Sequence, residues 1–276
     1  MDSWTTLDRD GVRLACRHFG GDGQSVFLLH GLAGHAEEWA QTASWLTARY
    51  RVEALDARGH GHSERAPVDV SLDAQVADAA FVIEHLGLRP VVLVGQSLGG
   101  VTALALAAER PDLVRGLVLV DASPSGGPEE AESAAVEIGT ALRRWPVPFR
   151  SRAAALDFFA RRFGGPLAAA AWADGLEQRD GGWWPRFDAE VMAQTLRESL
   201  REPTWDRWER IGCPTLVVRA GNGIVEPDIA REMVAQLPGA SLVEIPDAAH
   251  DLHLDRPGEW REALSRYLDS LPVETD

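Results

Sequence analysis

The stretch VVLVGQSLGGVTALALAAER, residues 91–110, predicts a strand that turns directly into a helix. Its first four residues are an unbroken apolar run, as in a strand that is buried on both faces of a parallel sheet. After GQSLG (95–99), apolar residues recur at helical spacing until Pro111, which cannot continue a helix. A strand joined to a helix through G-x-S-x-G is a nucleophile elbow, and it predicts Ser97 as the nucleophile.

The two glycines of this motif indicate how tight the turn is. We expect Ser97 to have a strained backbone, and we expect a side chain at Gly95 or Gly99 to collide with backbone that passes close by. The helix that follows Ser97 directs its N-terminal amides toward the group that the serine attacks, so developing negative charge is stabilised there.

Short apolar runs alternate with helical patterns on both sides of the elbow. The strand-like runs are residues 25–29, 51–55, 91–94, 116–120, 215–218 and 241–245, and the weaker run 12–19 is interpreted as an edge strand. Strands that alternate with helices form parallel sheets with helices on both faces. The sequence therefore predicts an α/β fold with a doubly wound, mostly parallel sheet.

Residues 124–210 interrupt this alternation. They are rich in alanine and arginine, helical in pattern and without a strand-like run. We therefore predict a core of residues 1–123 and 211–276 with a helical cap, residues 124–210, inserted into it. The cap holds several tryptophans, and most of these are expected to pack its helices onto the core. Trp183 and Trp184, in a predicted turn, are candidate substrate-binding residues, and at least one is expected to line an apolar pocket.

Composition excludes several functions. The 276 residues are 45% hydrophobic and 25% charged, as in an ordinary soluble protein, and the net charge of -15 argues against a nucleic-acid partner. All 27 basic residues are arginine, so lysine-based catalysis is excluded. We interpret Cys16 and Cys213 as small buried hydrophobes in a reducing compartment. With no signal peptide, no apolar run of membrane-spanning length, no metal cluster and no phosphate loop, we predict a cytoplasmic protein without a cofactor or a membrane partner.

The predicted general base is His250. A serine needs an imidazole to remove its proton, and the carboxyl ends of parallel strands meet at one edge of a sheet. His250 follows the last predicted strand, so it should meet Ser97 there. His60 and His62 lie in a glycine turn and are interpreted as structural, whereas His253 either lines the site or caps the next turn.

Two backbone amides are predicted to hold the oxyanion. One is the N–H of Leu98, directly after the nucleophile, and the other is the N–H of Leu32, after the turn His30-Gly31. Because both donors belong to the backbone, the side chains at these two positions matter little to the chemistry.

Four motifs together resemble the α/β-hydrolase superfamily. They are HGLAG (30–34), DARGHGHS (56–63), GQSLGG (95–100) and AAHDLHLDRP (248–257), in the family's order and spacing. The resemblance covers nearly the whole chain and implies an esterase-like or lactonase-like member with a serine nucleophile and a helical cap. It also implies that Asp56 folds its turn and is not catalytic.

The chain departs from the family at the triad acid. In most relatives the acid follows the seventh strand, at a position that falls on Gly223 here, and some members carry it after the sixth strand, where this chain has Asp121. We predict Asp121 as the acid, with an oxygen about 2.6–3.2 Å from the histidine's Nδ1. Glu226 and Asp228 are the alternatives, and a site without an acid is a further one.

These observations predict a serine hydrolase that cleaves a carboxylic ester or lactone with an apolar or aromatic part through an acyl-enzyme. Carbon–carbon bond hydrolases and thioesterases use the same triad and stay open. A ligand receptor on a hydrolase scaffold is an alternative of another class. The serine argues against relatives with an aspartate nucleophile, the epoxide hydrolases and dehalogenases.

Overall fold

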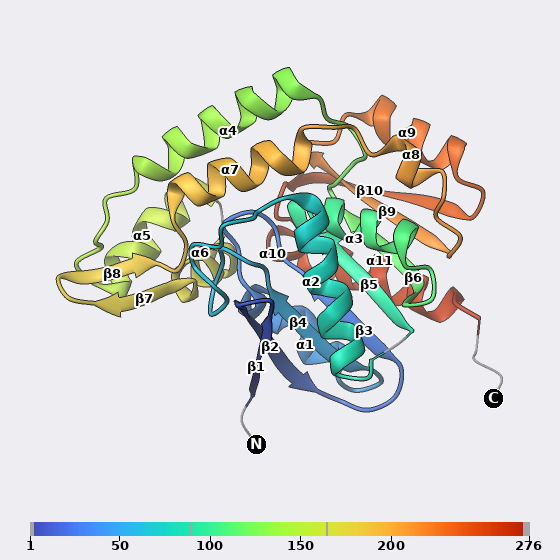
Figure 1. Cartoon of the computed structure of the whole chain (residues 1–276), viewed down its shortest axis with the longest axis horizontal. Coiled ribbons are helices and arrows are strands. Elements are labelled where there is room, and N and C mark those ends of the chain that lie inside the picture. Colours follow the sequence, from blue (N-terminus) through green and yellow to red (C-terminus); the bar gives the residue numbers. More distant parts are fainter. Residues whose placement is uncertain (1–2, 89, 164, 273–276) are drawn as a thin grey trace.

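The computed structural model describes residues 3–88, 90–163 and 165–272, and in this part of the chain eight strands form one sheet (Figure 1). Their order is β1 (Trp4–Arg9), β2 (Val12–Gly20), β4 (Arg51–Asp56), β3 (Ser25–Leu29), β5 (Val91–Gln96), β6 (Val114–Val120), β9 (Thr215–Asn222), β10 (Ala240–Ala249). The neighbouring strands β4, β3, β5, β6, β9 and β10 pair in parallel, and β2 pairs antiparallel with both β4 and β1. The predicted doubly wound, mostly parallel sheet is thus confirmed.

The strand predicted at the edge is not the edge strand. β2 lies between β4 and β1, and β1 covers it as an antiparallel partner. The hairpin turns at Asp10 and Gly11, both with positive φ (54° and 82°), a conformation typical of a two-residue hairpin turn. The dipeptide Asp10-Gly11 is thus a sequence signal for this hairpin.

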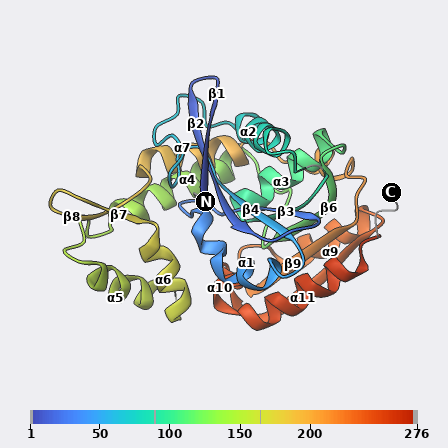
Figure 2. The ribbon, with the colours of Figure 1, turned by 90° about the horizontal axis from the view of Figure 1, so that it is seen from below.

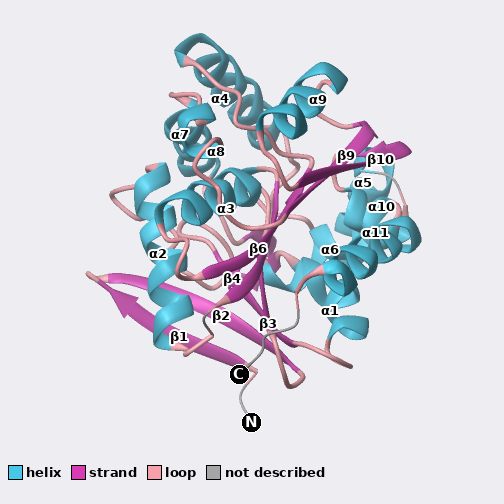
Figure 3. Ribbon diagram, turned by 90° about the vertical axis from the view of Figure 1, so that its right-hand side faces the viewer, coloured by secondary structure: helices cyan, strands magenta, loops and turns pink. Residues whose placement is uncertain are grey.

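Helices cover both faces of the sheet because its central strands are apolar on both faces. In β3, Phe27 and Leu29 pack into one core cluster, whereas Val26 and Leu28 pack into the other. The first cluster is covered by α2 (Leu72–His85), α3 (Leu98–Glu109), α8 (Trp205–Trp208) and α9 (Pro227–Gln236). The second is covered by η1 (Ala36–Trp39), α1 (Ala40–Leu46), α10 (Leu252–Asp255) and α11 (Pro257–Ser270). Figure 3 shows α2 and α3 on the opposite side of the sheet from α1 and α11.

The segment between β6 and β9 forms a cap over one end of the sheet. Before α8 it contains α4 (Pro128–Arg143), α5 (Arg152–Phe163), α6 (Pro166–Asp174), β7 (Leu176–Arg179), β8 (Gly182–Pro185) and α7 (Ala189–Leu200). α6 contacts η1 and α10, and α7 contacts α2 and α3. Helices of the cap thus rest on elements from both faces of the core.

The prediction that the cap has no strand is wrong. β7 and β8 form a short antiparallel hairpin, and Trp183 and Trp184 lie on β8 and not in a turn. Strands of four residues are too short for a periodic signal, and the hairpin depends on a tertiary partner. That partner is Phe149, whose N–H and C=O pair with Trp183 at 2.9 and 2.8 Å.

The hairpin lies at the far end of the cap in two views (Figures 1 and 2). Trp183 packs against the aromatic core of the cap, and the Trp184 indole lies under the guanidinium of Arg179, 5.5 Å from ring centre to carbon. A role for either side chain in substrate binding stays a prediction.

None of the helices among the described residues is both long and apolar enough to cross a bilayer.

Candidate active site

Ser97 lies between the last residue of β5 and the first residue of α3, in a strained conformation. Its φ of 50° and ψ of -118° are unusual for a residue with a side chain. A Cβ on Gly95 would lie 2.2 Å from the carbonyl oxygen of Gly99, and a Cβ on Gly99 would lie 2.5 Å from those of Leu29 and His30. The expectation that both glycines make room for the backbone is confirmed.

His250 and Asp121 meet at the same edge of the sheet. Asp121 directly follows β6 and is completely buried, and His250 directly follows β10. The His250 Nδ1 lies 2.7 Å from Oδ2 of Asp121, within the distance expected from the sequence. The same carboxylate accepts hydrogen bonds from the backbone N–H of Ala220 (3.2 Å) and of Ile224 (2.8 Å), which fix its orientation.

Gly223, at the position where most relatives carry the triad acid, has no space for a side chain. A Cβ on Gly223 would lie only 2.1 Å from Oδ2 of Asp121, so the carboxylate of Asp121 occupies the space that a side chain would need. The alternative acids, Glu226 and Asp228, are both exposed near the start of α9, and Asp228 pairs with Arg231. The structure thus brings Asp121, and neither alternative, to His250.

The environment of His250 favours the protonated imidazole. Burial alone would lower its pKa, but the hydrogen bond to Asp121 and the negative charges of Asp251, Asp121 and Glu38 together raise the pKa above its ordinary value. A third of the side chain remains exposed, so a substrate group can reach it. The arrangement can accept a proton at Nε2 and stabilise the cation that results.

The two predicted oxyanion amides lie in segments that pack closely together. Leu98 begins α3, and Leu32 lies in the turn after β3, where the N–H of Gly34 bonds to the carbonyl of Gly31 at 3.0 Å. Within residues 3–88, 90–163 and 165–272, no hydrogen bond engages the N–H of Leu32 or of Leu98. An oxyanion role for the two amides stays a prediction.

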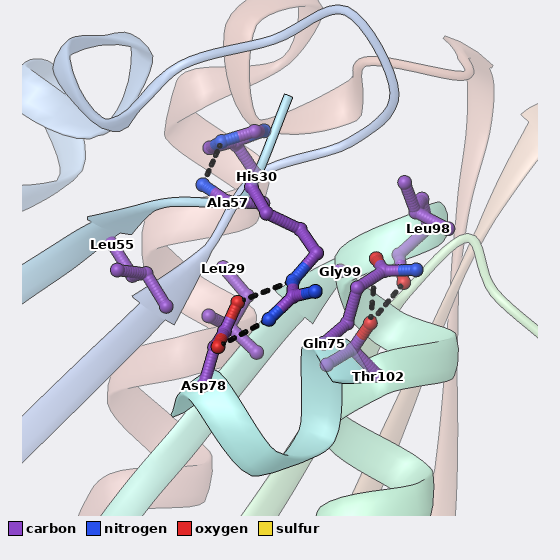
Figure 4. Close-up of a pocket in the computed structure, with 10 residues that line it drawn as sticks. Leu29, His30, Leu55, Ala57, Gln75, Asp78, Leu98, Gly99 and Thr102 are labelled. Atoms are coloured by element: carbon purple, nitrogen blue, oxygen red, sulfur yellow. Dashed lines mark hydrogen bonds and ion pairs between the residues drawn. The ribbon is translucent and has the colours of Figure 1, made fainter. Parts of the chain in front are cut away.

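A small cavity of about 20 Å³ lies beneath the elbow (Figure 4). It is lined by Leu29, His30, Leu55, Ala57, Arg58, Gln75, Asp78, Leu98, Gly99 and Thr102. In its wall, Thr102 Oγ1 donates to the carbonyl of Leu98 at 3.2 Å, and Arg58 Nε donates to Asp78 at 2.6 Å. Neither Ser97 nor His250 lines this cavity. We therefore interpret the residues around it as packing that holds α3 in place, and not as a substrate site.

Three other histidines near the sheet edge, His30, His60 and His253, are buried. His30 bonds to the carbonyl of Gly31 at 2.7 Å and accepts from the N–H of Ala57 at 3.0 Å, and burial keeps its pKa well below the ordinary value. Burial lowers the pKa of His60 to about 4. His253 is 1% exposed and stacks on Trp39 at 4.3 Å, so it packs under the site and does not line it.

Polar side chains that the sequence analysis did not single out lie beside His250. Gln96 Nε2 lies 3.3 Å from His250 Nε2, and Asp251 and Glu38 contribute charge to the imidazole. The positions of Gln96 and Asp251, each next to a predicted catalytic residue, were the only signal available. Among the described residues, no group of three or more histidine, cysteine or acidic side chains is arranged to hold a metal ion, and both cysteines are free.

Comparison with known proteins agrees with this geometry. A family model described as the alpha/beta hydrolase fold matches residues 24–257. The sn-1-specific diacylglycerol lipase ABHD11 of Mus musculus is 31% identical over 255 residues, which are 88% of this chain and 80% of the lipase. The esterase Rv0045c of Mycobacterium tuberculosis is 30% identical over 274 residues, 93% of this chain and 87% of that protein.

Among solved structures, E-2-(acetamidomethylene)succinate hydrolase superposes with a TM-score of 0.88 and 26% identity, covering 97% of this chain and 99% of that one. The fold, the elbow with its strained serine and the family match lead to one conclusion. The chain belongs to the α/β-hydrolase fold family.

Proposed function

We propose that this protein is a serine hydrolase that cleaves carboxylic esters or lactones with an apolar part, through Ser97, His250 and Asp121. The observation that carries the proposal is the 2.7 Å contact between a fully buried Asp121 and the Nδ1 of His250. A buried acid at Nδ1 holds the imidazole in the tautomer that leaves Nε2 free to accept a proton.

The chemistry follows from these positions. His250 Nε2 takes the proton of Ser97 Oγ while Oγ forms a bond to the carbonyl carbon, and the N–H groups of Leu32 and Leu98 stabilise the negative oxygen. The imidazolium then gives its proton to the alcohol oxygen as the ester bond breaks. A water molecule, deprotonated by His250, attacks the acyl-enzyme, and the acid product leaves with Ser97 restored.

The contacts of residues 30–34, here called the oxyanion loop because they include the proposed donor Leu32, support an apolar substrate. Leu32 packs against the cap cluster that contains Leu142, Trp145 and Met192, so the surroundings of the scissile carbonyl are apolar on the cap side. Two relatives, the mouse lipase and the mycobacterial esterase, are named for ester hydrolysis. Trp183, at the border of the same cluster, is the proposed contact for long acyl groups, with Trp184 beside it.

A second candidate rests on the structural likeness to E-2-(acetamidomethylene)succinate hydrolase, at a TM-score of 0.88. In this case the substrate would be the compound that the name of that enzyme specifies. Activity on this compound, on acyl esters of increasing length, on lactones and on thioesters can be compared in one screen. Saturable hydrolysis with many turnovers would also exclude a receptor without catalysis.

The test of the nucleophile is Ser97→Ala. We expect hydrolysis to fall by about 10⁴-fold or more, with an unchanged melting temperature, because Ser97 carries chemistry and little packing. A fluorophosphonate should label the wild type at Ser97. Labelling of Ser97→Ala at the wild-type rate would show that another residue is the nucleophile.

A further inference from the structure

Asp251, the residue after His250, connects the core to the cap through its two carboxylate oxygens. Oδ1 lies 3.3 Å from Nε2 of Gln96, the last residue of β5, and Oδ2 lies 3.3 Å from Nε1 of Trp172, on α6. Both neighbouring nitrogens carry hydrogen atoms that a carboxylate accepts. One side chain thus joins the elbow strand, the histidine loop and the cap.

Gln96 extends this connection to the imidazole. Its Nε2 lies 3.3 Å from His250 Nε2 and 3.3 Å from the carbonyl oxygen of His250. The glutamine is 1% exposed, and a Cβ on Gly31 would lie 2.0 Å from its Oε1, so the oxyanion loop encloses the amide on its other side. The amide that Asp251 holds therefore faces the nitrogen that must receive the serine's proton.

Trp172 extends the connection into the cap. Its ring stacks on Phe163 with centroids 4.6 Å apart and meets Trp145 edge-on at 5.8 Å. α6 also contacts α10, the helix that begins at Leu252 (Figure 2), and His35 Nε2 bonds to the carbonyl of Ala171 at 2.8 Å. The position of the Trp172 indole therefore depends on how α6 is docked.

We propose that Asp251 is a positioning residue that couples docking of the cap to the orientation of His250, with Trp172 and Gln96 as its two contacts. The inference rests on the proposed role of His250 as the base. Without the cap contact the carboxylate would turn toward water, and the amide of Gln96 would lose the acceptor that holds it against the histidine loop.

Charges around the imidazole make this coupling measurable. Besides Asp251, the ionisable groups that face His250 are Asp121 at the end of β6, Glu38 on η1 and His253 on α10. Burial, against the opposing effect of His35 and with a smaller contribution from the charge of Asp251, raises the pKa of Glu38 to about 8. Burial lowers the pKa of His253 to about 4. At neutral pH His253 is thus neutral.

The first test is Asp251→Asn, which removes the charge and keeps the shape. The imidazole of His250, followed by NMR and assigned with a His250→Asn variant, should titrate about half a unit to one unit lower than in the wild type. The acidic limb of kcat/KM should move by the same amount. Asp247→Asn is the matched control, since Asp247 is an exposed aspartate in the irregular end of β10, just before His250, and it should leave both values unchanged.

The second test examines the cap contact. Trp172→Phe keeps an aromatic ring and removes the donor, and we expect it and Asp251→Asn each to lower kcat on a long-chain ester by about 3-fold to 10-fold. The double variant should fall no more than about 2-fold below the worse single one. Trp184→Phe is the control, because that indole donates to the carbonyl of Asp180 at 3.4 Å inside the hairpin, and its effect should combine multiplicatively with that of Asp251→Asn.

An unchanged imidazole titration in Asp251→Asn, or multiplicative effects of Trp172→Phe and Asp251→Asn, would overturn the inference. If Asp251→Asn does not fold, Trp172→Phe decides alone: the imidazole must titrate lower in this variant and not in Trp184→Phe. A failure of the proposed function is distinguishable. In that case His250→Ala would retain wild-type hydrolysis while the imidazole titration still responded to Asp251→Asn.

Discussion

Asp56 and Asp121 are two buried aspartates in nearly the same position, at the ends of the parallel strands β4 and β6. Each is fully buried, and each accepts hydrogen bonds from two backbone N–H groups. Each also has a glycine pressed against its carboxylate, because a Cβ on Gly61 would lie 2.2 Å from Asp56 and one on Gly223 would lie 2.1 Å from Asp121. Position, burial and backbone bonding thus do not separate the two.

They differ in the side chain that faces them. Asp121 has the imidazole of His250 at 2.7 Å, whereas the hydrogen bonds to the carboxylate of Asp56 within the described residues come from the N–H groups of Ala36 and His62. Burial raises the pKa of Asp56 to about 6, although both backbone bonds act to lower it. A buried carboxylate at the end of a strand can therefore organise a turn by itself, and it can assist a base only where a second loop places an imidazole against it.

Substitution of each aspartate by asparagine should give the largest difference in kcat between the two positions. Asp121→Asn should lower kcat by about 10³-fold to 10⁴-fold with little change in KM, since an asparagine no longer fixes the tautomer of His250. Asp56→Asn should change kcat by less than about 10-fold and should lower the free energy of unfolding by about 1–3 kcal/mol.

Steady-state kinetics and thermal unfolding of both variants test this difference, with Glu226→Gln as a control that should cost less than about 10-fold. Comparable losses of kcat in Asp56→Asn and Asp121→Asn would remove the distinction. A loss confined to Glu226→Gln would transfer the role of the acid to the start of α9.

A smaller effect is expected from the two glycines. Gly223→Ala should push the carboxylate of Asp121 away from His250 and lower kcat by about 10²-fold, the cost of a displacement on the order of 1 Å. Gly61→Ala should act on stability, because Gly61 has a φ of 55°, where a Cβ costs about 1–2 kcal/mol before any clash with Asp56. The values of kcat and of the melting temperature should be measured for both variants. A loss of stability alone in both would show that Gly223 does not differ from Gly61 in its effect on catalysis.

The smallest expected effect concerns the midpoint of the pH profile of kcat/KM. Only neutral His250 can act as the base, so kcat/KM should rise with pH as the imidazole loses its proton. Since the pKa of His250 is raised, the midpoint should lie above pH 6.5, and activity should fall as the pH drops through it. Asp56→Asn should leave this midpoint unchanged, because Asp56 is not among the groups that shift His250. A flat profile from about pH 5 to 9 would argue against a histidine base.

The sheet, the elbow and the placement of the His250 loop beside the elbow strand could all be predicted from the sequence. These features depend on local pattern, namely apolar runs, helical spacing and glycines in a tight turn, together with the rule that parallel strands end at one edge. The missed edge strand β1 is a local feature too, since the Asp10-Gly11 turn is visible in the sequence.

Which carboxylate faces His250, and the lack of space for a side chain at position 223, depend on contacts between distant segments. The contact joins residues 129 positions apart, and Asp121, Glu226 and Asp228 all follow strands or begin a helix near the same edge. The hairpin β7–β8, held by Phe149, and the contact between Asp251 and Trp172 likewise depend on packing between distant segments. Local propensity cannot supply such information, because the energy that selects these partners comes from burial and hydrogen bonds formed only after the chain has folded.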